Sequence, residues 1–162
     1  MNTVTYLDHN GTTPLRPAVL EAVAAALEIG GNASSVHSLG RLARRKIEEA
    51  RENLSGLVGS APRITFTGSG SEANNLALRG CGCKLALFSA IEHPSVLDAA
   101  ADPLIIGVDG RGVLDLAVLE SKLTAADGPA VLSIMLANNE TGVIQPVAQA
   151  ARMAHEHGAL VH

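Results

Sequence analysis

The sequence predicts an α/β fold, a largely parallel sheet with helices on both faces. From residue 84 onward, short apolar segments alternate with segments of helical length, the pattern of βαβ units. With 162 residues, 47% of them hydrophobic, the chain can bury one sizeable core. Because it has one Tyr, two Phe and no Trp, this core must be mostly aliphatic.

The first sixty residues predict two helices. Residues 4–8 could form a short extended segment, and Thr13 can cap a first helix that begins at Pro14 or nearer Pro17. Its apolar stripe (Val19, Leu20, Val23 and Leu27) ends at Gly30-Gly31. Residues 41–58 predict an amphipathic helix, with Arg44–Glu48 and Arg45–Glu49 as ion pairs on a solvated face.

The rest of the chain predicts alternating strands and helices. Strands are expected at 63–67, 84–90, 104–108, 130–136 and from 159; helices are expected from 71 and at 93–101, 115–125 and 146–157. Polar loops follow three of these strands, at 67–72, 90–95 and 137–145. Because ligands bind at the carboxyl ends of strands in such sheets, we expect all three loops to face one crevice.

Residues 65–75, Thr-Phe-Thr-Gly-Ser-Gly-Ser-Glu-Ala-Asn-Asn, predict a phosphate site. An expected strand runs through a small-residue turn into a helix, and the first N–H groups of a helix have no partner within it. Gly70 lets a ligand approach the backbone, and Ser69 and Ser71 add hydroxyl donors.

Two kinds of phosphate ligand fit this turn. Gly68-x-Gly70-x-x-Ala73 matches the dinucleotide fingerprint, and Glu92 lies near the usual spacing of about 20 residues for a ribose-binding acid. An NAD-type oxidoreductase domain is therefore one hypothesis. This hypothesis gives no role to the sixty residues before the fingerprint or to the polar segments at 32–40 and 138–142.

Five stretches, in order, support the other hypothesis. Together they resemble the cysteine desulfurases of the NifS/IscS type, which are class V aminotransferase-like, fold-type I pyridoxal-phosphate (PLP) enzymes. The resemblance runs from Tyr6 to His162. Its motifs are Tyr6-Leu-Asp-His-Asn-Gly-Thr-Thr-Pro14, Gly31-Asn-Ala-Ser-Ser-Val-His37 with Gly40-Arg41, Thr67-Gly-Ser-Gly-Ser-Glu-Ala-Asn-Asn75, Glu92-His-Pro-Ser-Val-Leu97 and Asn138-Asn-Glu-Thr-Gly-Val-Ile-Gln-Pro146.

The resemblance implies the cofactor, PLP, and the residues that bind it. Gly70 and Ser71 would hold the phosphate, His93 would stack on the pyridine ring and handle protons, and Asn139 would lie beside the phenolic oxygen. The family usually has Ser-Gly-Ala-Thr-Glu at 68–72, so the hydroxyl is kept at Ser71 while the glycine has moved. Further candidates, at the active-site mouth in the family, are Asn32, His37 and Arg41.

Residues 1–13 are expected to border the active site, and residues 14–162 to form an incomplete PLP-binding large domain, truncated at its C-terminus. A PLP enzyme needs a Schiff-base lysine, and none of the three lysines, Lys46, Lys84 and Lys122, has the family's Ser-x-His-Lys context. The family's pyridine-nitrogen aspartate and catalytic cysteine would also lie beyond His162. We therefore expect an incomplete copy that is inactive alone.

The resemblance also implies L-cysteine as substrate, L-alanine as product, and transfer of sulfur as a persulfide to an iron–sulfur scaffold or another acceptor. A homodimer in the full-length protein and a cytoplasmic location are expected. The formal charge of −4 argues against a nucleic-acid partner, and no membrane is expected. Cys81 and Cys83 are too few for a closed zinc site, so no metal is expected. A selenocysteine lyase, an aminotransferase of the same class and a non-catalytic remnant remain alternatives.

Overall fold

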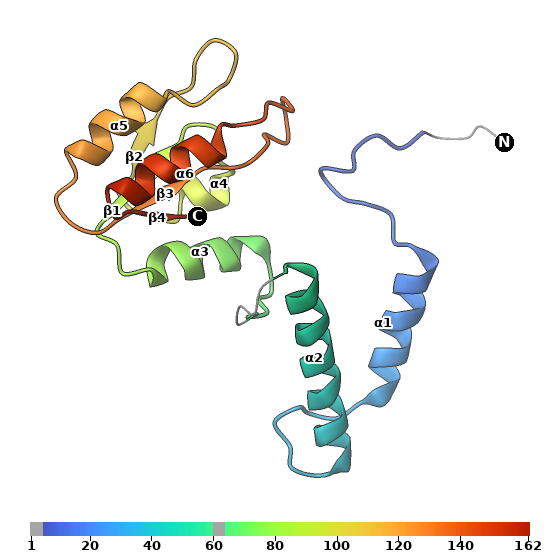
Figure 1. Ribbon diagram of the computed structural model, residues 1–162. Helices are drawn as coiled ribbons and strands as arrows, with labels where there is room; N and C mark the ends of the chain where they lie inside the picture. The colour runs from blue at the N-terminus through green and yellow to red at the C-terminus, as the bar shows by residue number, and fades with distance from the viewer. Residues whose placement is uncertain (1–4, 60–63) are drawn as a thin grey trace. The chain divides into compact units, whose positions relative to one another are not determined.

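The computed structural model describes residues 5–59 and 64–162. The chain divides into two compact units, residues 1–66 and residues 67–162 (Figure 1). The first unit contains α1 (Pro17–Ile29) and α2 (Ser38–Leu57). The second contains a sheet with four helices, so the α/β architecture resides in residues 67–162.

The helix α1 begins at Pro17, the later of its two predicted starts. Arg16 is its N-cap residue, and the helix ends at Gly30, whose φ of 61° is in the region that favours glycine. Val19, Leu20, Val23 and Leu27 are all exposed, so the predicted apolar stripe is not buried within the described part of this unit.

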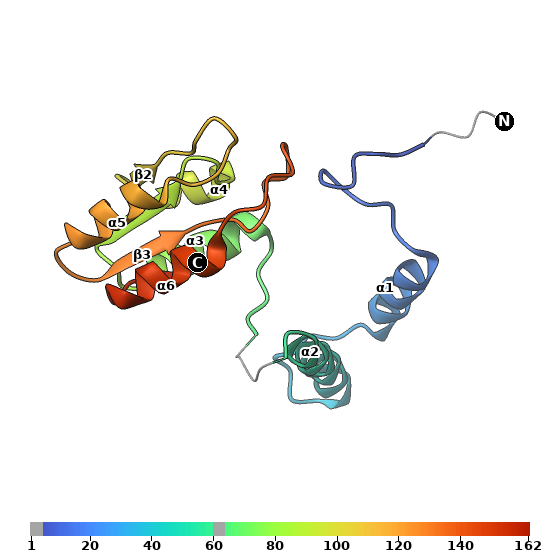
Figure 2. The same ribbon diagram turned by 45° about the horizontal axis from the view of Figure 1, so that its top comes forward.

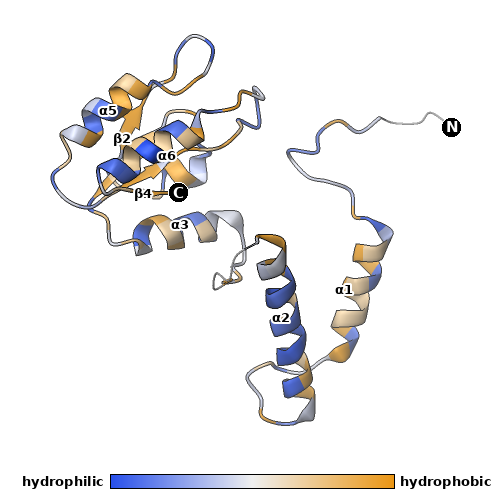
Figure 3. Cartoon of the chain, viewed as in Figure 1, coloured by the Kyte–Doolittle hydropathy of each residue, from blue (hydrophilic) through white to orange (hydrophobic). Residues whose placement is uncertain are grey.

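The helix α2 begins three residues before its predicted start, because the imidazole of His37 caps it. Nδ1 of His37 accepts a hydrogen bond from the N–H of Gly40 at 3.3 Å. Figure 3 shows that most of this helix is hydrophilic, as expected for a solvated face. Its ion pairs differ from the predicted ones: among the described residues, Lys46 pairs with Glu49 and Arg51 with Glu48, one turn apart.

The prediction of a strand at 63–67 was wrong for its described part, residues 64–67, which form no strand; Arg63 lies outside the described residues. The side chain of Arg51 holds this segment instead. Its Nη1 donates to the carbonyl of Ile64, and its guanidinium lies 5.0 Å from the ring centre of Phe66. The expected extended segment at 4–8 likewise forms no strand at 5–8, where Tyr6 Oη donates to the carbonyls of Asp8 and Thr12; residue 4 is not described.

The second unit is built on a parallel sheet in the order β2-β1-β3-β4. Leu85 on β1 pairs with Ala130 on β3, and Leu87 on β1 with Leu104 on β2. The strands are β1 (Leu85–Ser89), β2 (Leu104–Ile106), β3 (Ala130–Ser133) and β4 (Leu160–Val161). The helices are α3 (Gly70–Gly80), α4 (Pro94–Leu97), α5 (Leu116–Thr124) and α6 (Val147–Glu156).

Helices cover both faces of this sheet (Figure 2). Side chains alternate between faces along a strand, so Leu87 and Leu132 point to one core while Phe88 and Val131 point to the other. The first core is closed by α5 and α6, and the second by α3 and α4. The predicted fold class, a largely parallel sheet with helices on both faces, is confirmed.

Several elements are shorter than predicted, most clearly α4, β2 and β3. The helix α4 ends at Leu97, and the guanidinium of Arg79 donates to the carbonyl oxygens of Ala99 and Asp98 beyond it, at 3.0 and 3.4 Å. The strand β2 ends at Ile106, two residues before its predicted end. The strand β3 ends at Ser133, and its predicted last residues join the loop that follows it. Within residues 5–59 and 64–162, no helix combines the length and apolar character that crossing a membrane requires.

Candidate functional site

The sheet has a topological switch point between β1 and β3. The connection after β1 leads through α4 to β2 on one side, and the connection after β3 leads through α6 to β4 on the other side. Such opposed connections open a crevice at the carboxyl ends of the two strands. The loops that begin there are 90–93 and 134–145, which carry His93 and Asn139.

Two hydrogen bonds connect these loops across the switch point. Oε1 of Glu92 accepts from the N–H of Met135 at 2.5 Å, and Nδ2 of Asn138 donates to the carbonyl of Ile91 at 3.2 Å. Glu92 is buried, and burial raises the pKa of its carboxyl above the ordinary value despite the opposing hydrogen bonds from Met135 and Ser133. Because this carboxylate is engaged inside the protein, the dinucleotide hypothesis loses its ribose-binding acid.

Asn138 organises the loop after β3. Its Oδ1 accepts from the N–H groups of Glu140 and Thr141 at 3.0 and 2.8 Å, and from the hydroxyl of Thr141 at 3.1 Å. Both ends of this amide are therefore used to hold the loop. The next residue, Asn139, is exposed.

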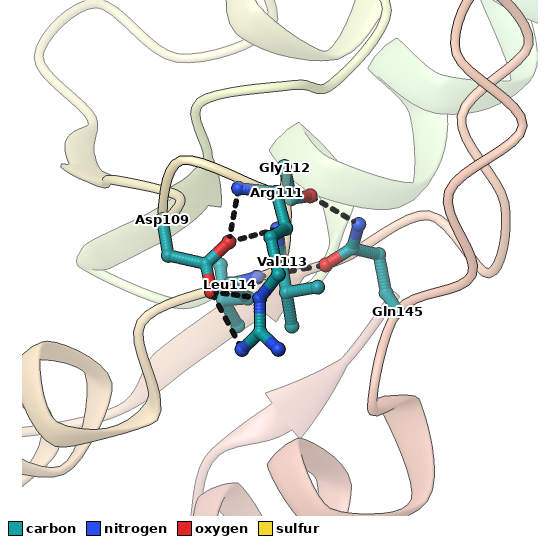
Figure 4. A network of polar contacts seen from close by, with 6 residues as sticks. All are labelled: Asp109, Arg111, Gly112, Val113, Leu114 and Gln145. Carbon is teal, nitrogen blue, oxygen red and sulfur yellow. Dashed lines mark hydrogen bonds and ion pairs between the residues drawn. The ribbon is translucent and has the colours of Figure 1, made fainter.

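The same loop is tied at its other end to the turn after β2 (Figure 4). Oε1 of Gln145 accepts from the N–H of Leu114 at 2.9 Å, and its Nε2 donates to the carbonyl of Gly112 at 2.8 Å. Gln145 is only 4% exposed. A buried amide that satisfies two backbone groups fixes the path of the chain between Asn139 and α6.

The start of α3 has the geometry of an anion site. Ser69, the N-cap residue, accepts at Oγ from the N–H of Glu72 at 3.1 Å, and Glu72 Oε2 accepts from the N–H of Gly68 at 2.6 Å, an arrangement similar to a capping box but shifted by one residue. In the part of the chain that the structure describes, the N–H groups of Gly70 and Ser71 form no hydrogen bond. A Cβ at Gly70 would meet no atom within 4 Å, so no other side chain crowds the backbone at this point. Two N–H donors without a partner at the start of a helix are suited to a phosphate.

His93 is the N-cap residue of α4 and is exposed. Its Nδ1 lies 3.1 Å from the nitrogen and 2.8 Å from the Oγ of Ser95. Ser95 Oγ in turn accepts from Nδ2 of Asn74, on α3, at 2.8 Å. Since Asn74 lies about one helical turn after Gly70, these bonds tie the His93 loop to the start of α3, as Glu92 and Asn138 tie it to the loop of Asn139.

The other candidates, Asn32, His37 and Arg41, lie in the first unit and have local contacts. Asn32 Oδ1 accepts from the N–H of Ser34 at 2.9 Å, His37 caps α2, and Arg41 donates to the carbonyl of Val36. These bonds shape the loop before α2.

Of the three lysines, Lys46 belongs to the first unit, and the two of the second unit lie away from the carboxyl ends of the strands. Lys46 is paired with Glu49 on α2, and Lys122 is in the last turn of α5. Lys84 directly precedes β1, so the five residues of this strand, about 16 Å of extended chain, separate it from the loop of His93.

The two cysteines lie at the far end of α3 from Gly70. Cys81 is the C-cap residue of this helix, and its Sγ donates to the carbonyl of Leu78 at 3.1 Å. Burial, with a smaller contribution from Cys81, raises the pKa of the Cys83 thiol. Neither thiol is part of the candidate site, and no group of three or more metal-binding side chains occurs among the residues described.

The sequence analysis missed Asn74 and Ser95. Asn74 belongs to the motif at 67–75, and Ser95 follows His93 by two residues, a spacing typical of a side chain that caps a turn. These signals suggest local capping. They do not indicate that the two side chains bond to each other.

Comparison with known proteins identifies the family and the similar structures. The aminotransferase class-V family model matches residues 5–162. An IscS-like cysteine desulfurase of Mycobacterium tuberculosis is 37% identical over 97% of the chain, and a cysteine desulfurase of Gluconacetobacter diazotrophicus is 39% identical over 100% of it; the match spans 44% of each relative. The structure of a NifS-like protein from Rickettsia africae superposes with a TM-score of 0.86 at 34% identity, covering 95% of this chain and 45% of that one.

The chain therefore spans less than half the length of these relatives. The resemblance to NifS/IscS-type cysteine desulfurases is confirmed, and it covers an amino-terminal portion of them. With its family model matched from residue 5 to residue 162, the chain belongs to the aminotransferase class-V family.

Proposed function

We propose that this chain supplies one part of the cofactor site of a PLP-dependent cysteine desulfurase. The observation that supports it best is a set of three hydrogen bonds: Asn74–Ser95 joins α3 to α4, while Glu92–Met135 and Asn138–Ile91 join the loops at the switch point. These bonds connect three of the five motifs that carry the resemblance, at 67–75, 92–97 and 138–146. The two relatives described above are named as cysteine desulfurases.

Each predicted site residue has a chemical task in this proposal. Gly70 and Ser71 donate their N–H groups, and Ser71 its hydroxyl, to the cofactor phosphate at the positive end of α3. His93 packs its flat ring against the pyridine ring and handles a proton beside it. Asn139 donates from its NH₂ group to the phenolic oxygen.

When bound, PLP withdraws electrons from the α-carbon of an amino-acid substrate. The residues of this chain bind, orient and donate hydrogen bonds, and the second unit provides no lysine at this edge of the sheet. We therefore propose that the chain alone, an incomplete copy of the enzyme, does not turn over cysteine. Residues 1–13 would border the active site, and residues 14–162 would form part of the large domain.

The complete enzyme would convert L-cysteine to L-alanine and pass the sulfur on as a persulfide. The acceptor would be an iron–sulfur scaffold or another protein of thio-cofactor synthesis. We also propose that the complete protein is a cytoplasmic homodimer.

A titration of the 162-residue chain with PLP, followed by amide NMR, tests the cofactor site. We expect shifts at Gly70, Ser71, His93 and Asn139, and pyridoxal without phosphate should not shift Gly70 and Ser71. Ser71→Ala should weaken PLP binding about fivefold, the effect of losing one hydrogen bond. The matched control is Ser121→Ala on the exposed face of α5, which should bind PLP as the parent chain does.

Two results would contradict the proposal. If PLP shifts none of the four residues, the cofactor site is wrong. If the chain alone releases sulfide from cysteine at enzymatic rates, its proposed incompleteness is wrong.

A further inference from the structure

Asn74, Ser95 and His93 form a hydrogen-bonded series between α3 and the start of α4. Asn74 and Ser95 are half-buried between these helices, and His93 is exposed. The distances are 2.8 Å from Asn74 Nδ2 to Ser95 Oγ and 2.8 Å from Ser95 Oγ to His93 Nδ1. The series therefore begins inside the protein and ends on the imidazole of the candidate site.

Donor chemistry gives this series a direction. The NH₂ group of Asn74 can only donate, so Ser95 Oγ accepts from it and keeps its own hydrogen for another partner. The acceptor within reach is Nδ1 of His93. The N–H of Ser95 also donates to Nδ1, at 3.1 Å. Two donors thus converge on one ring nitrogen.

A ring nitrogen that accepts hydrogen bonds carries no proton. In the neutral imidazole the proton must then be on the other nitrogen, Nε2. Nε2 of His93 forms no hydrogen bond to any residue that the structure describes, and the side chain is exposed. The series accordingly leaves a single N–H donor on the free side of the ring.

We propose that Asn74 and Ser95 are positioning residues that hold neutral His93 as its Nε2–H tautomer and fix the plane of its ring. His93 then presents a hydrogen-bond donor at Nε2 toward the cofactor and substrate. The statement that Nε2 is directed toward cofactor and substrate rests on the proposed function. The tautomer of His93 is a property of this chain alone. The alternative is that Asn74 and Ser95 only connect α3 to α4.

Nitrogen-15 NMR of the histidines tests this in the 162-residue chain without cofactor. At about pH 9, well above the ordinary titration range of histidine, Nδ1 of His93 should have the shift of an unprotonated nitrogen and Nε2 that of a protonated one. His93→Gln assigns these signals. The other five histidines serve as an internal check that the fold is intact.

Asn74→Asp is the decisive variant because it has nearly the same shape but reverses the polarity of the series. A carboxylate can only accept, so it takes the hydroxyl hydrogen of Ser95, whose lone pair then faces Nδ1. We expect the ratio of the Nε2–H to the Nδ1–H tautomer to fall about fivefold, the change that one hydrogen bond produces.

Two further variants separate this relay from a general effect of charge. Asn75→Asp places the same charge on the next residue, whose Nδ2 donates to the carbonyl of Ser71 at 2.8 Å, and it should leave the tautomer of His93 unchanged. In the double variant Asn74→Asp with Ser95→Ala, the hydroxyl is absent, so the effect of Asn74→Asp should disappear.

An unchanged tautomer in Asn74→Asp, or an equal change in Asn75→Asp, would overturn the proposal. A fall of the ratio that needs the hydroxyl of Ser95 would support it. Neither outcome depends on PLP binding. A failure of the proposed function and a failure of this inference can therefore be told apart.

Discussion

Oε1 of Glu92 lies 2.5 Å from the backbone nitrogen of Met135, and this bond joins the loops that follow β1 and β3. Glu92 is 8% exposed, in a motif where the sequence alone suggested a ligand contact. An internal bond across the switch point keeps the loops of His93 and Asn139 together. Several properties of the chain should depend on such internal bonds.

The first prediction concerns the pH dependence of stability. Burial raises the pKa of Glu92 above its ordinary value of 4.5, so the folded state retains this proton to a higher pH than the unfolded chain does. Between pH 4.5 and the raised pKa, the folded state binds more protons than the unfolded state does. The free energy of unfolding therefore falls as the pH rises through this range. Glu92→Gln keeps an acceptor for Met135 and removes the charge.

The stability of Glu92→Gln relative to the parent chain should accordingly increase as pH rises from 4 and level off above the raised pKa. Urea unfolding at a series of pH values measures this difference. Glu140→Gln, at an exposed position in the loop after β3, is the control and should show no such trend. If the unfolding free energies of Glu92→Gln and the parent chain change with pH in the same way, the pKa of Glu92 is not raised in the folded state.

The second prediction separates the two ends of the Asn138 amide. Asn138→Ala removes the donor to Ile91 and the acceptor for residues 140 and 141, at an expected cost of about 2–3 kcal/mol in unfolding free energy. Asn138→Asp keeps the acceptor and loses only the donor. Hydrogen exchange at the amide of Thr141 should therefore speed up in the Ala variant and stay protected in the Asp variant. Equal exchange in both would contradict this division.

The third prediction concerns the link between Gln145 and the turn after β2. Gln145→Met removes both bonds and leaves the buried N–H of Leu114 without its partner, which should cost about 1–3 kcal/mol. Exchange of the Leu114 amide should become faster. Gln149→Met, at an exposed position of α6, is the matched control. If both substitutions have the same effect, the link does not stabilise the fold.

The fourth prediction compares two glycines of α2. A Cβ on Gly40 would lie 2.7 Å from the carbonyl oxygen of Asn32 and from the Cβ of Ser35, closer than real contacts allow. Gly40→Ala should therefore destabilise the helix against its preceding loop by about 1–3 kcal/mol. A Cβ on Gly56 would meet nothing within 4 Å, so Gly56→Ala should stabilise α2 by up to about 1 kcal/mol.

Thermal unfolding of the 162-residue chain, followed by helical circular dichroism, measures both variants. The decisive result is the opposite sign of the two shifts in Tm. Two Tm shifts of the same sign would mean that the close contacts around Gly40 do not determine how Gly40→Ala changes the stability.

Much of the fold follows from the sequence because its pattern is local. Apolar segments of strand length between helical segments gave the correct order of elements from β1 to β4. The prediction of a strand at 63–67 was wrong because alternating apolar and polar residues favour an extended chain but do not show that another strand lies beside it. Arg51, thirteen residues earlier in the sequence, supplies the hydrogen bond to Ile64 instead.

The candidate site could be predicted only in part. The sequence correctly predicts that the loops after β1 and β3 lie at one edge, because strand ends determine where loops begin in a parallel sheet. The same reasoning fails for the loop at 67–72, because the described residues that lead into it, 64–66, form no strand. The sequence does not predict which side chains connect the loops. Asn74 and Ser95 are twenty-one residues apart, and their bond depends on how α3 packs on α4. The roles of Gly70, Ser71, His93 and Asn139 stay predictions.

The central pairing of β1 with β3 has a consequence for folding kinetics. Leu85 lies opposite Ala130, and β2 with its flanking helices occupies the chain between them. Bringing the two ends of so long a segment together lowers the entropy of the chain before the hydrogen bonds and packing of the paired strands form. Contacts between residues this far apart in sequence therefore form slowly. Helices can form while the switch point is still open. In refolding, the junction of the loops of His93 and Asn139 should thus be completed after most of the secondary structure.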